Sequence, residues 1–552
     1  MTGTNVLIVG AGPVGLTLAI DLAWRGIDVT VVEARPPAAA PDPKCNHVAA
    51  RTMEIFRRLG LAEKVRNAGL PADYPHDISY RTTFTGEELT RIKIPCRRDR
   101  FTMKDGPDCN WPTPEPPHRI NQIFLEPILF EHAVSQPRIR IISRTSVEDV
   151  VVEDTCAHAS LRDLEAGTVS RIDCRYLIGC DGSRSIVRKA IGAELAGDAV
   201  VQRVQSTYIR APKLIGLQQH ERAWGTGSIN PRRSGMVYAI DGCERWLVHN
   251  YMKSGEGDFD EVDRDACIRT ILGVGADFSY EIISKEDWYG RRLIANRFRD
   301  RCAFIAGDAA HIWVPYAGYG MNAGIADAMN LSWLLAAHLN GWAPSAILDA
   351  YEAERWPITS QVSRFAMSHA EAEIRRRGAV PEEIEDAGPS GECARREVGR
   401  LAYEINVQQY ACAGLNFGSY YDCSPIIAYD GAQHPAYTMD SFTPSTVPGC
   451  RTPHLWCADG RSLYDAMGPE FTLLRFDSAA ETAPLEAAAR ARGAPLRVLD
   501  IRKPGLATTD GGGLVLSRPD QHVGWRGNRL PADPLALIDR VRGAAIQAAT
   551  SD

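Results

Sequence analysis

Val6-Leu-Ile-Val9-Gly10-Ala-Gly12-Pro-Val-Gly15 is an apolar run followed by three spaced glycines. The apolar run predicts a buried strand, and the residues from about Pro13 to Arg25 predict a helix directly after the turn. A second strand is expected over Asp28 to Glu33. Strand, glycine turn, helix and strand form a βαβ unit, which predicts an α/β protein that begins with a Rossmann-like domain.

The glycine turn is suited to bind a nucleotide, because a pyrophosphate reaches the backbone N–H groups of a helix start only where no Cβ intervenes. Glu33 ends the second strand, where a carboxylate can accept hydrogen bonds from both ribose hydroxyls of an adenosine. A tight turn without a ligand is the alternative interpretation. The candidate contacts at this place are Gly10, Gly12, Pro13, Val14, Gly15, Glu33 and Ala34.

Two further glycine segments follow in a fixed order, Gly179-Cys-Asp181-Gly182 and Gly307-Asp308-Ala-Ala-His311. The latter leads into a glycine-containing loop and a helix expected to begin near Met321. The Asp308 carboxylate is placed for a ribityl hydroxyl, and the helix start would favour negative charge on a reduced flavin by roughly 0.3 to 2 kcal/mol. A loop that turns into a buried helix is the alternative. Three separate contacts indicate one long cofactor, which would be FAD. The candidate contacts are Asp181, Gly182, Gly307, Asp308, Pro315, Gly318, Gly320, Met321 and Asn322.

The pattern along the chain predicts a discontinuous organisation. Residues 1–75, 105–195 and 290–370 are expected to form the FAD-binding domain, with a substrate-binding domain from residues 76–104 and 196–289. The runs 234–240 and 245–251 alternate apolar and polar residues and predict strands of this inserted mixed sheet. Residues 371–430 are expected to be a helical connection, and residues 431–552 a small C-terminal α/β domain.

Composition excludes several functions. The chain has 552 residues, 45% of them hydrophobic, and a net charge of −7, so neither nucleic acid nor an anionic membrane is an expected partner. Its 14 cysteines show no C-x-x-C spacing, so no metal site is expected and they are interpreted as thiols of a cytoplasmic protein. No segment is apolar enough over a sufficient length to span a bilayer.

The three glycine segments resemble those of the class A flavoprotein monooxygenases, specifically aromatic hydroxylases of the phenol hydroxylase and polyketide hydroxylase type. Asp181-Gly182 and Gly307-Asp308 are similar to two motifs of this family. The resemblance implies that Gln122 contacts the flavin and that Arg51 lies near the pyrophosphate. The segments 448–454, 459–464 and 518–523 resemble the family's thioredoxin-like C-terminal domain, here without C-x-x-C, for which packing or homodimer contacts are expected.

The resemblance implies a reaction as well. NAD(P)H reduces FAD, O2 forms a flavin C4a-hydroperoxide, and an electron-rich ring carbon of a small phenolic substrate attacks its distal oxygen. The candidates for a base or hydrogen-bond acceptor are His47, Tyr238, His249 and Tyr289. A core or surface role is the alternative for each one. Baeyer–Villiger insertion or epoxidation, and a flavin-binding protein without turnover, remain alternative functions.

Overall fold

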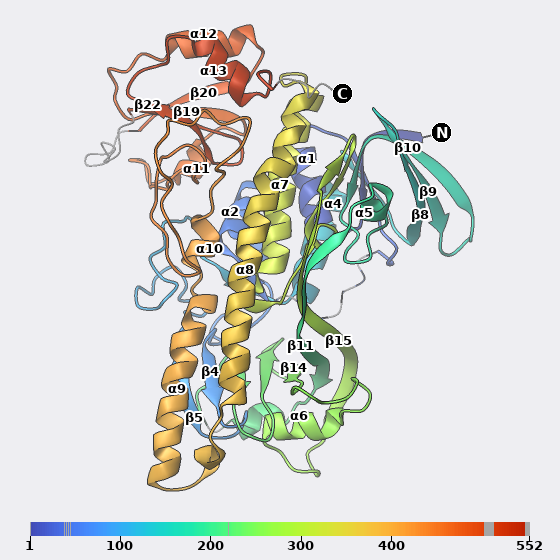
Figure 1. The fold of residues 1–552 in the computed structure, drawn as a ribbon, viewed down its shortest axis with the longest axis vertical. Coiled ribbons are helices and arrows are strands. Elements are labelled where there is room, and N and C mark those ends of the chain that lie inside the picture. Colours follow the sequence, from blue (N-terminus) through green and yellow to red (C-terminus); the bar gives the residue numbers. More distant parts are fainter. Residues whose placement is uncertain are drawn as a thin grey trace.

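The structure is a computed structural model, and it describes residues 2–37, 39, 41, 43–44, 46–218, 220–501 and 513–546. Figure 1 shows an α/β unit in the middle, a second sheet at one end of the molecule and a small C-terminal unit at the other. Helix α8 (Ala350–Gly378) runs along the molecule between these two ends. Among the described helices, none has the length and apolar character needed to cross a membrane.

The first sheet contains parallel strands in the order β17-β10-β1-β2-β7, with β16 antiparallel at the β17 edge. A hairpin of β8 and β9 extends it, because β9 pairs with the first half of β10. We call this eight-stranded sheet the parallel sheet. Its strands are β1 (Thr2–Val9), β2 (Val29–Val32), β7 (Ile139–Ile142), β8 (Thr145–Val152), β9 (Ala157–Asp163), β10 (Val169–Gly179), β16 (Arg299–Asp300) and β17 (Ala303–Ile305).

The predicted βαβ unit is present. β1 ends at Val9, α1 covers Pro13–Trp24 and β2 begins at Val29, because the apolar run from Val6 is buried between two neighbouring strands. Helix α7 (Tyr319–Leu339) packs against α1 and begins two residues before the predicted start. The shorter helices around this sheet are α2 (Ala50–Arg58), α3 (Ala62–Arg66), α4 (Gln122–Ser135) and α5 (Ile186–Ala190).

The second sheet, called the mixed sheet below, has the order β18-β15-β11-β14-β13-β12-β4-β5. All of its neighbouring strands are antiparallel except β12 and β4. The two predicted strands correspond to β13 and β14. The strands are β4 (Ile78–Arg81), β5 (Glu88–Ile92), β11 (Leu195–Arg210), β12 (Gly225–Ser228), β13 (Gly235–Ala239), β14 (Arg245–Tyr251), β15 (Glu281–Ala295) and β18 (His311–Ile312). A short pair, β3 (His47–Val48) and β6 (His118–Arg119), lies apart.

The expected helical connection does more than join two units. Helix α9 (Pro389–Tyr410) packs on β5, where a Cβ on Gly399 would lie 2.3 Å from the Leu89 carbonyl oxygen. Val398 and Ala402 of α9 are buried in the same apolar cluster as Ile78 and Trp246 of the mixed sheet. Helix α9 therefore completes the core of that sheet. Helices α6 (Arg264–Leu272) and α10 (Ala413–Phe417) complete this part of the fold.

The C-terminal unit is the small α/β domain that the sequence predicts. Its sheet has the order β20-β19-β21-β22, with α12 and α13 packed together. Strand β22 was not predicted, and residues 502–512 lie outside the described part. The elements are α11 (Leu463–Ala466), β19 (Phe471–Arg475), α12 (Ala483–Ala491), β20 (Leu496–Asp500), β21 (Leu514–Ser517), β22 (Val523–Gly527) and α13 (Pro534–Val541).

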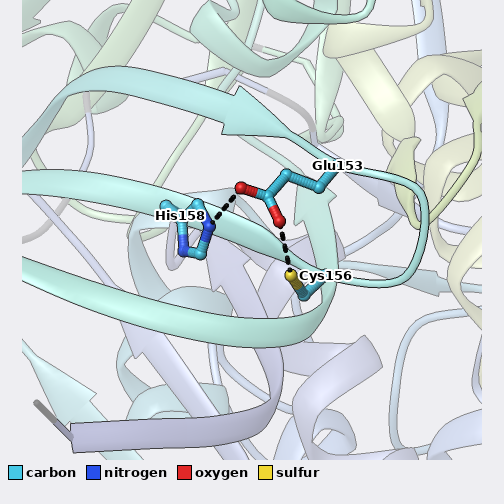
Figure 2. A group of neighbouring side chains, drawn as sticks. All are labelled: Glu153, Cys156 and His158. Atoms are coloured by element: carbon cyan, nitrogen blue, oxygen red, sulfur yellow. Dashed lines mark hydrogen bonds and ion pairs between the residues drawn. The ribbon is translucent and has the colours of Figure 1, made fainter.

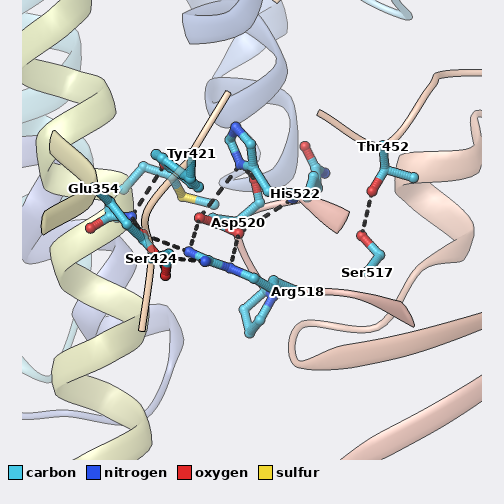
Figure 3. Close-up of polar contacts among 12 residues, drawn as sticks. Glu354, Tyr421, Ser424, Thr452, Ser517, Arg518, Asp520 and His522 are labelled. Atoms are coloured by element: carbon cyan, nitrogen blue, oxygen red, sulfur yellow. Dashed lines mark hydrogen bonds and ion pairs between the residues drawn. The ribbon is translucent and has the colours of Figure 1, made fainter. Parts of the chain in front are cut away.

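A buried ion-pair cluster joins the C-terminal unit to α8 (Figure 3). Both terminal nitrogens of Arg518 donate to Glu354, at 2.5 and 2.7 Å, and Arg518 also donates to Asp520 at 2.7 Å. Burial alone would raise the pKa of Asp520, but the charge of Arg518 outweighs it and holds that pKa well below its usual range. The Arg518 side chain has no exposed surface, so the interface is buried and charged at this point.

Candidate functional site

The three glycine segments meet at one edge of the parallel sheet. They follow β1, β10 and β17, which are parallel neighbours, so their carboxyl ends lie together. The Cys180 N–H donates to the Val9 carbonyl oxygen at 2.8 Å, and the Ala306 N–H donates to that of Gly179 at 3.0 Å. Segments that are more than a hundred residues apart in sequence therefore form one surface.

The first turn is shaped by close backbone contacts. Gly10 has a φ of +101°, and a Cβ there would lie 2.4 Å from the Cys180 carbonyl oxygen. A Cβ on Gly15 would lie 2.0 Å from the Gly10 carbonyl oxygen, so neither position accepts a side chain. Gly12 differs, because a Cβ there would meet no protein atom within 4 Å. The start of α1 is thus open on the side of Gly12, as pyrophosphate binding requires.

Glu33 lies at the end of β2, beside the glycine turn. Its carboxylate accepts from the Ala11 N–H at 2.7 Å and from the Arg35 N–H at 2.9 Å. Burial raises the pKa of this carboxyl, but the hydrogen bonds from Arg35 outweigh burial and lower it overall, so Glu33 is ionised. A carboxylate has about four acceptor positions, which leaves capacity for ribose hydroxyls. Ala34 is exposed next to it.

Gln122 is connected to Glu33 through a series of charged groups. Arg35 donates to Glu126 at 2.9 Å, and the Gln122 amide nitrogen donates to the other oxygen of Glu126. Gln122 is the first residue of α4 and stays partly exposed. Within the described part of the chain, no protein group donates to the amide oxygen of Gln122, so it can accept a hydrogen bond from a ligand.

A buried carboxylate that the sequence analysis did not identify binds the backbone of the third glycine segment, at Gly307. Asp327 of α7 accepts from the Gly307 N–H at 3.2 Å and from Arg355 at 2.8 Å, and it lies 2.7 Å from His311 Nε2. Burial raises the pKa of Asp327, and the neighbouring charges of His311 and Arg355 lower it overall. The side chain of Asp308 is exposed although both of its neighbours are buried.

The first and third segments are in direct contact. A Cβ on Gly307 would lie 3.0 Å from Val14 Cγ2, and one on Gly324 of α7 would lie 2.6 Å from the same atom. The N-terminal part of α7 therefore packs as closely as glycine permits against the start of α1. Small residues here bring two helix starts to one place.

The loop before α7 has an unusual backbone. Ala317 has a φ of +60° and Gly318 a φ of +59°, and for alanine this left-handed conformation costs of order 1–2 kcal/mol. Asn322 stabilises the loop. Its amide nitrogen donates to the carbonyls of His47 (3.0 Å) and Gly318 (2.7 Å), and its amide oxygen accepts from the Ala49 N–H and the Thr52 hydroxyl, both at 2.8 Å.

The Asn322 amide thus makes all of its four hydrogen bonds within the protein. Pro315 in the same loop is exposed, Gly320 has open space around its Cα, and Met321 packs on the core around α7.

Asp181 and Gly182 serve the local fold. Asp181 Oδ2 accepts from the Ile186 N–H at 2.7 Å at the start of α5, while Gly182 has a φ of +75° in the preceding turn. Burial raises the pKa of Asp181 overall, although this hydrogen bond lowers it in part. Their position beside Gly10 follows from the Gly10–Cys180 contact.

Arg51 is bonded to the C-terminal unit. It donates to Glu54 at 2.8 Å, to the Asp520 carbonyl at 2.6 Å and to the Gln521 side chain. A cavity of about 50 Å³ adjoins it, enclosed by α2, α7, α8 and the C-terminal unit. Asp520 and Gln521 lie 469 and 470 residues away from Arg51 in sequence, which explains why a local pattern did not reveal these two partners.

The mixed sheet presents one face to the loop that follows Gly307. A Cβ on Gly290 of β15 would lie 2.9 Å from Val314 Cγ1 of this loop. The same face carries Trp288, two residues before Gly290. His249 on β14 lies with its ring centroid 6.2 Å from that of Trp288 and 5.7 Å from that of Tyr238. Two of the predicted catalytic candidates are therefore together, facing the loop.

His47 is connected to Tyr238 of the mixed sheet through Arg119 and Trp224. Its Nδ1 is bonded to Arg119, whose guanidinium lies 5.1 Å from the Trp224 ring centroid, and the Trp224 ring lies 5.0 Å from that of Tyr238. Burial and the charge of Arg119 hold the pKa of His47 well below its usual range, so the ring is neutral. A Cβ on Gly318 would lie 2.9 Å from the Cβ of His47. A continuous series of side chains thus connects the mixed sheet to the loop before α7.

Tyr289 does not join this group. It lies on the opposite face of β15 from Trp288, is 45% exposed and packs on Phe259 with ring centroids 5.1 Å apart. Successive residues of a strand point to opposite faces, so a shift of one position separates an outward side chain from an inward one. The residue that sequence reasoning missed on the inner face is Trp288. Alternation along β15 places Trp288 and Tyr289 on opposite faces, but it does not say which face meets the loop.

Comparison with known proteins agrees with this geometry. Residues 3–366 match the model of an FAD binding domain, and residues 445–545 match that of the aromatic-ring hydroxylase C-terminal region. Phenol 2-monooxygenase of Pseudomonas sp. (strain EST1001) is 28% identical over 96% of this chain and 94% of its own length. Tetracenomycin B2 monooxygenase-dioxygenase of Streptomyces olivaceus is 29% identical over 97% of each chain.

The structure of the rebeccamycin biosynthetic enzyme RebC with reduced flavin superposes with a TM-score of 0.87 at 32% identity, covering 98% of this chain and 99% of that one. The predicted fold class is confirmed: a Rossmann-like FAD-binding unit, an inserted mixed sheet and a thioredoxin-like C-terminal domain. Small aromatic compounds and O2 are the reactants that the family implies. The open start of α1 beside Gly12 fits the FAD that the family binds. The chain belongs to the FAD-dependent aromatic-ring hydroxylases and is a flavin-dependent monooxygenase.

Proposed function

We propose that this hydroxylase acts on a phenolic aromatic compound, taking electrons from NAD(P)H and an oxygen atom from O2. The observation that carries the proposal is the inner face of the mixed sheet, where Tyr238, His249 and Trp288 face the loop before α7. Bound FAD supplies the redox chemistry between NAD(P)H and O2. The residues of this chain bind and orient the substrate, exclude water and hold protons. Relatives named for phenol and tetracenomycin B2 oxygenation support a phenolic substrate.

The FAD contacts are assigned to the edge of the parallel sheet and to the loop before α7. Asn322 would contribute only its backbone N–H, because its side chain is fully bonded, and Arg51 is assigned to docking of the C-terminal unit. The contacts are Gly10, Gly12, Pro13, Val14, Gly15, Glu33, Ala34, Gln122, Asp181, Gly182, Gly307, Asp308, Pro315, Gly318, Gly320, Met321 and Asn322.

His249 is assigned as a hydrogen-bond donor to the substrate oxygen. Trp288 Nε1–H can only donate, and it donates to Ser206 Oγ at 2.9 Å. Ser206 Oγ lies 2.6 Å from His249 Nδ1, and we assign the Ser206 hydroxyl as the donor in this hydrogen bond. Burial lowers the pKa of His249 to about 4, so the imidazole is neutral and its single proton lies on Nε2. His249 is therefore unsuited to act as a base near neutral pH.

A donor at this position favours the phenolate form of the substrate. A hydrogen bond to a charged oxygen stabilises it by about 1.5–3 kcal/mol, which lowers the phenol pKa and makes the ring more nucleophilic. Burial raises the pKa of Tyr238 well above its usual range, so its hydroxyl stays protonated. His47 is assigned a positioning role, because its ring lies against Gly318 and its Nδ1 is bonded to Arg119.

The proposed function is tested with the FAD-loaded protein, NADPH or NADH, and a panel of phenols. We expect O2 consumption coupled to a product that is heavier by one oxygen atom on a ring carbon. An oxygen inserted into a carbon–carbon bond would indicate Baeyer–Villiger chemistry instead. A yellow protein that consumes NAD(P)H but leaves every phenol unchanged would contradict the phenolic substrate class.

The role of His249 is tested by comparing His249→Ala with His249→Gln. The alanine variant should lose about 10- to 150-fold in kcat/KM for hydroxylation, the equivalent of 1.5–3 kcal/mol, whereas glutamine keeps an N–H donor and recovers part of it. Tyr289→Phe, on the outer face of the same sheet, is the matched control and should behave as the parent. If His249→Ala forms product at the parental rate, the donor lies elsewhere.

The division into domains stays a proposal: residues 1–75, 105–195 and 290–370 for FAD binding, 76–104 and 196–289 for substrate binding. Residues 371–430 would form a helical connection, and residues 431–552 the thioredoxin-like C-terminal domain. β15 extends to Ala295, which favours a boundary between the substrate-binding and FAD-binding segments slightly beyond residue 290. A homodimer and a cytoplasmic location are also proposed; the described cysteines form no disulfide, which supports the latter. Light scattering of the purified protein tests the dimer.

A further inference from the structure

A cluster of metal-ligating side chains lies outside the candidate site, at the turn between β8 and β9. Val152 pairs with Ala157, so residues 153–156 form a tight loop at the end of the hairpin. Figure 2 shows Glu153, Cys156 and His158 pointing toward one another from this turn. Their ligand atoms all lie within 4.8 Å of one another. The spacing Glu-x-x-Cys-x-His contains no C-x-x-C pair, which explains why it was not recognised in the sequence.

The two separations between Glu153 and its neighbours are close to those between the ligands of a tetrahedral zinc site. Glu153 Oε1 lies 2.9 Å from His158 Nε2, and Glu153 Oε2 lies 3.3 Å from Cys156 Sγ. Ligands at zinc distances of about 2.0–2.3 Å in tetrahedral geometry are about 3.3–3.6 Å apart. A shift of a few tenths of an ångström, at an exposed turn, would open the cluster enough for the ion.

The second nitrogen of His158 is already held as metal-bound histidines usually are. His158 Nδ1 lies 2.7 Å from Asp173 Oδ1 on β10, the strand in which Asp173 is paired with His158. A carboxylate on the remote nitrogen fixes the ring orientation and directs Nε2 toward the metal. Asp173 is itself held by Arg171 at 2.9 Å.

We propose that Glu153, Cys156 and His158 bind one Zn²⁺ ion, with water as the fourth ligand and Asp173 as the residue that orients His158. A thiolate, an imidazole and a carboxylate form the mixed set that zinc prefers, whereas Mg²⁺ and Ca²⁺ require oxygen ligands. Binding forms the Zn–S bond and releases the thiol proton of Cys156 to water. The carboxylate and thiolate then balance the charge of the ion.

The ion would cross-link the end of the β8–β9 hairpin, and the bond from His158 to Asp173 would connect it to β10. Cys302 Sγ donates to the Glu153 carbonyl oxygen at 3.5 Å, so the turn also adjoins the start of β17. Figure 1 places this hairpin at the outer edge of the parallel sheet, apart from the mixed sheet. The site is therefore separate from the hydroxylation chemistry.

Alkylation of individual cysteines by iodoacetamide, resolved by peptide mass spectrometry, tests the site in the FAD-loaded protein after treatment with a chelator. Equimolar Zn²⁺ should protect Cys156, and fresh chelator should restore its reactivity. Cys393 is exposed and should react equally with and without Zn²⁺. If Cys156 is alkylated as fast in saturating Zn²⁺ as without the ion, the proposal is overturned.

Two variants separate this site from incidental thiol binding. His158→Gln keeps Cys156 but removes a ligand, and it should abolish the protection; His132→Gln on α4 is the matched control. Asp173→Ala should require about 10- to 100-fold more Zn²⁺ for the same protection. Protection that persists in His158→Gln would overturn the three-ligand site.

Discussion

At the scale of single residues, the chemistry of each candidate side chain depends on its hydrogen-bonding partners. The strand pattern led to His249 and Tyr238, and both face the loop before α7. It could not reveal that Ser206 bonds to His249 Nδ1 and that Trp288 bonds to Ser206, because these partners come from β11 and β15. Burial decides the ionisation of His249, and burial is a property of the folded chain.

The depressed pKa of His249 predicts a pH dependence of stability. The folded-state pKa of about 4 lies below the unfolded value near 6.5, so the unfolded chain binds more protons between these values. The stability that the fold gains from a neutral His249 is complete above pH 6.5 and is lost as the pH falls toward 4. Between pH 7 and pH 5 it amounts to about 2 kcal/mol.

Urea unfolding at pH 7 and pH 5 measures this effect. His249→Asn removes the titrating group, so the variant should lose about 2 kcal/mol less than the parent over this interval. Equal losses for the two proteins would mean that His249 titrates normally in the fold.

The open space at Gly12 allows a test of the FAD position by a single methyl group. Gly12 has a φ of −74°, and alanine there meets no protein atom, so the apoprotein should keep its stability or gain about 0.4–1 kcal/mol. The methyl group would occupy the pyrophosphate position and should weaken FAD binding at least about tenfold.

Flavin fluorescence titration of the apoprotein measures the dissociation constant for FAD in Gly12→Ala. Gly216→Ala is the control, because this glycine also has open space but lies far from the glycine turn in sequence. Parental FAD affinity in Gly12→Ala would place the pyrophosphate away from this turn.

At the scale of elements, the regular patterns located strands and helices well and their surroundings poorly. β13, β14 and α1 lie within about two residues of their predicted positions, because burial of one face imposes a period that the sequence displays. Tyr289 shows the limit of this reasoning. β15 has a register irregularity opposite residues 198–202 of β11, and which face meets the loop depends on that pairing.

The contact between α1 and α7 predicts a strong effect of one added methyl group. A Cβ on Gly324 would lie 2.6 Å from Val14 Cγ2 and 2.9 Å from Gly307 Cα. Gly324→Ala should therefore lower the free energy of unfolding by about 1–3 kcal/mol through overpacking. Gly378→Ala, also in a helix but with open space, should be neutral or stabilising.

The double variant Val14→Ala/Gly324→Ala removes the side-chain clash and leaves the clash with the Gly307 backbone. Thermal unfolding should therefore show a partial recovery relative to Gly324→Ala. No difference between Gly324→Ala and Gly378→Ala would contradict this packing.

At the scale of the whole molecule, polar contacts hold the C-terminal unit on the FAD-binding part. The Arg518–Glu354 pair and the bonds of Arg51 to residues 520 and 521 connect segments that no local sequence pattern relates. Trp333 of α7 lies 6.3 Å from Phe471 of β19, ring centroid to ring centroid, in the same interface. Figure 3 shows the charged part of this contact around Arg518.

Removal of Arg518 should release the C-terminal unit. Arg518→Ala leaves Glu354 buried without its main cationic partner, which should cost about 3–5 kcal/mol. The control is Arg475→Ala, whose partner Asp500 is exposed, with an expected cost of at most about 1 kcal/mol. Melting temperature and limited proteolysis report the difference, and similar behaviour of the two variants would contradict a docking role.

The sequence by itself determined the α/β fold class, the order of its units and the use of FAD. These follow from local periodicity and from glycines whose backbone geometry is a local property. The tertiary structure alone decided that Asn322 and Arg51 are engaged within the protein, that Asp327 supports Gly307, and that Trp288 rather than Tyr289 faces the loop. Such outcomes depend on strand register and on contacts between distant segments, which only the folded chain brings together.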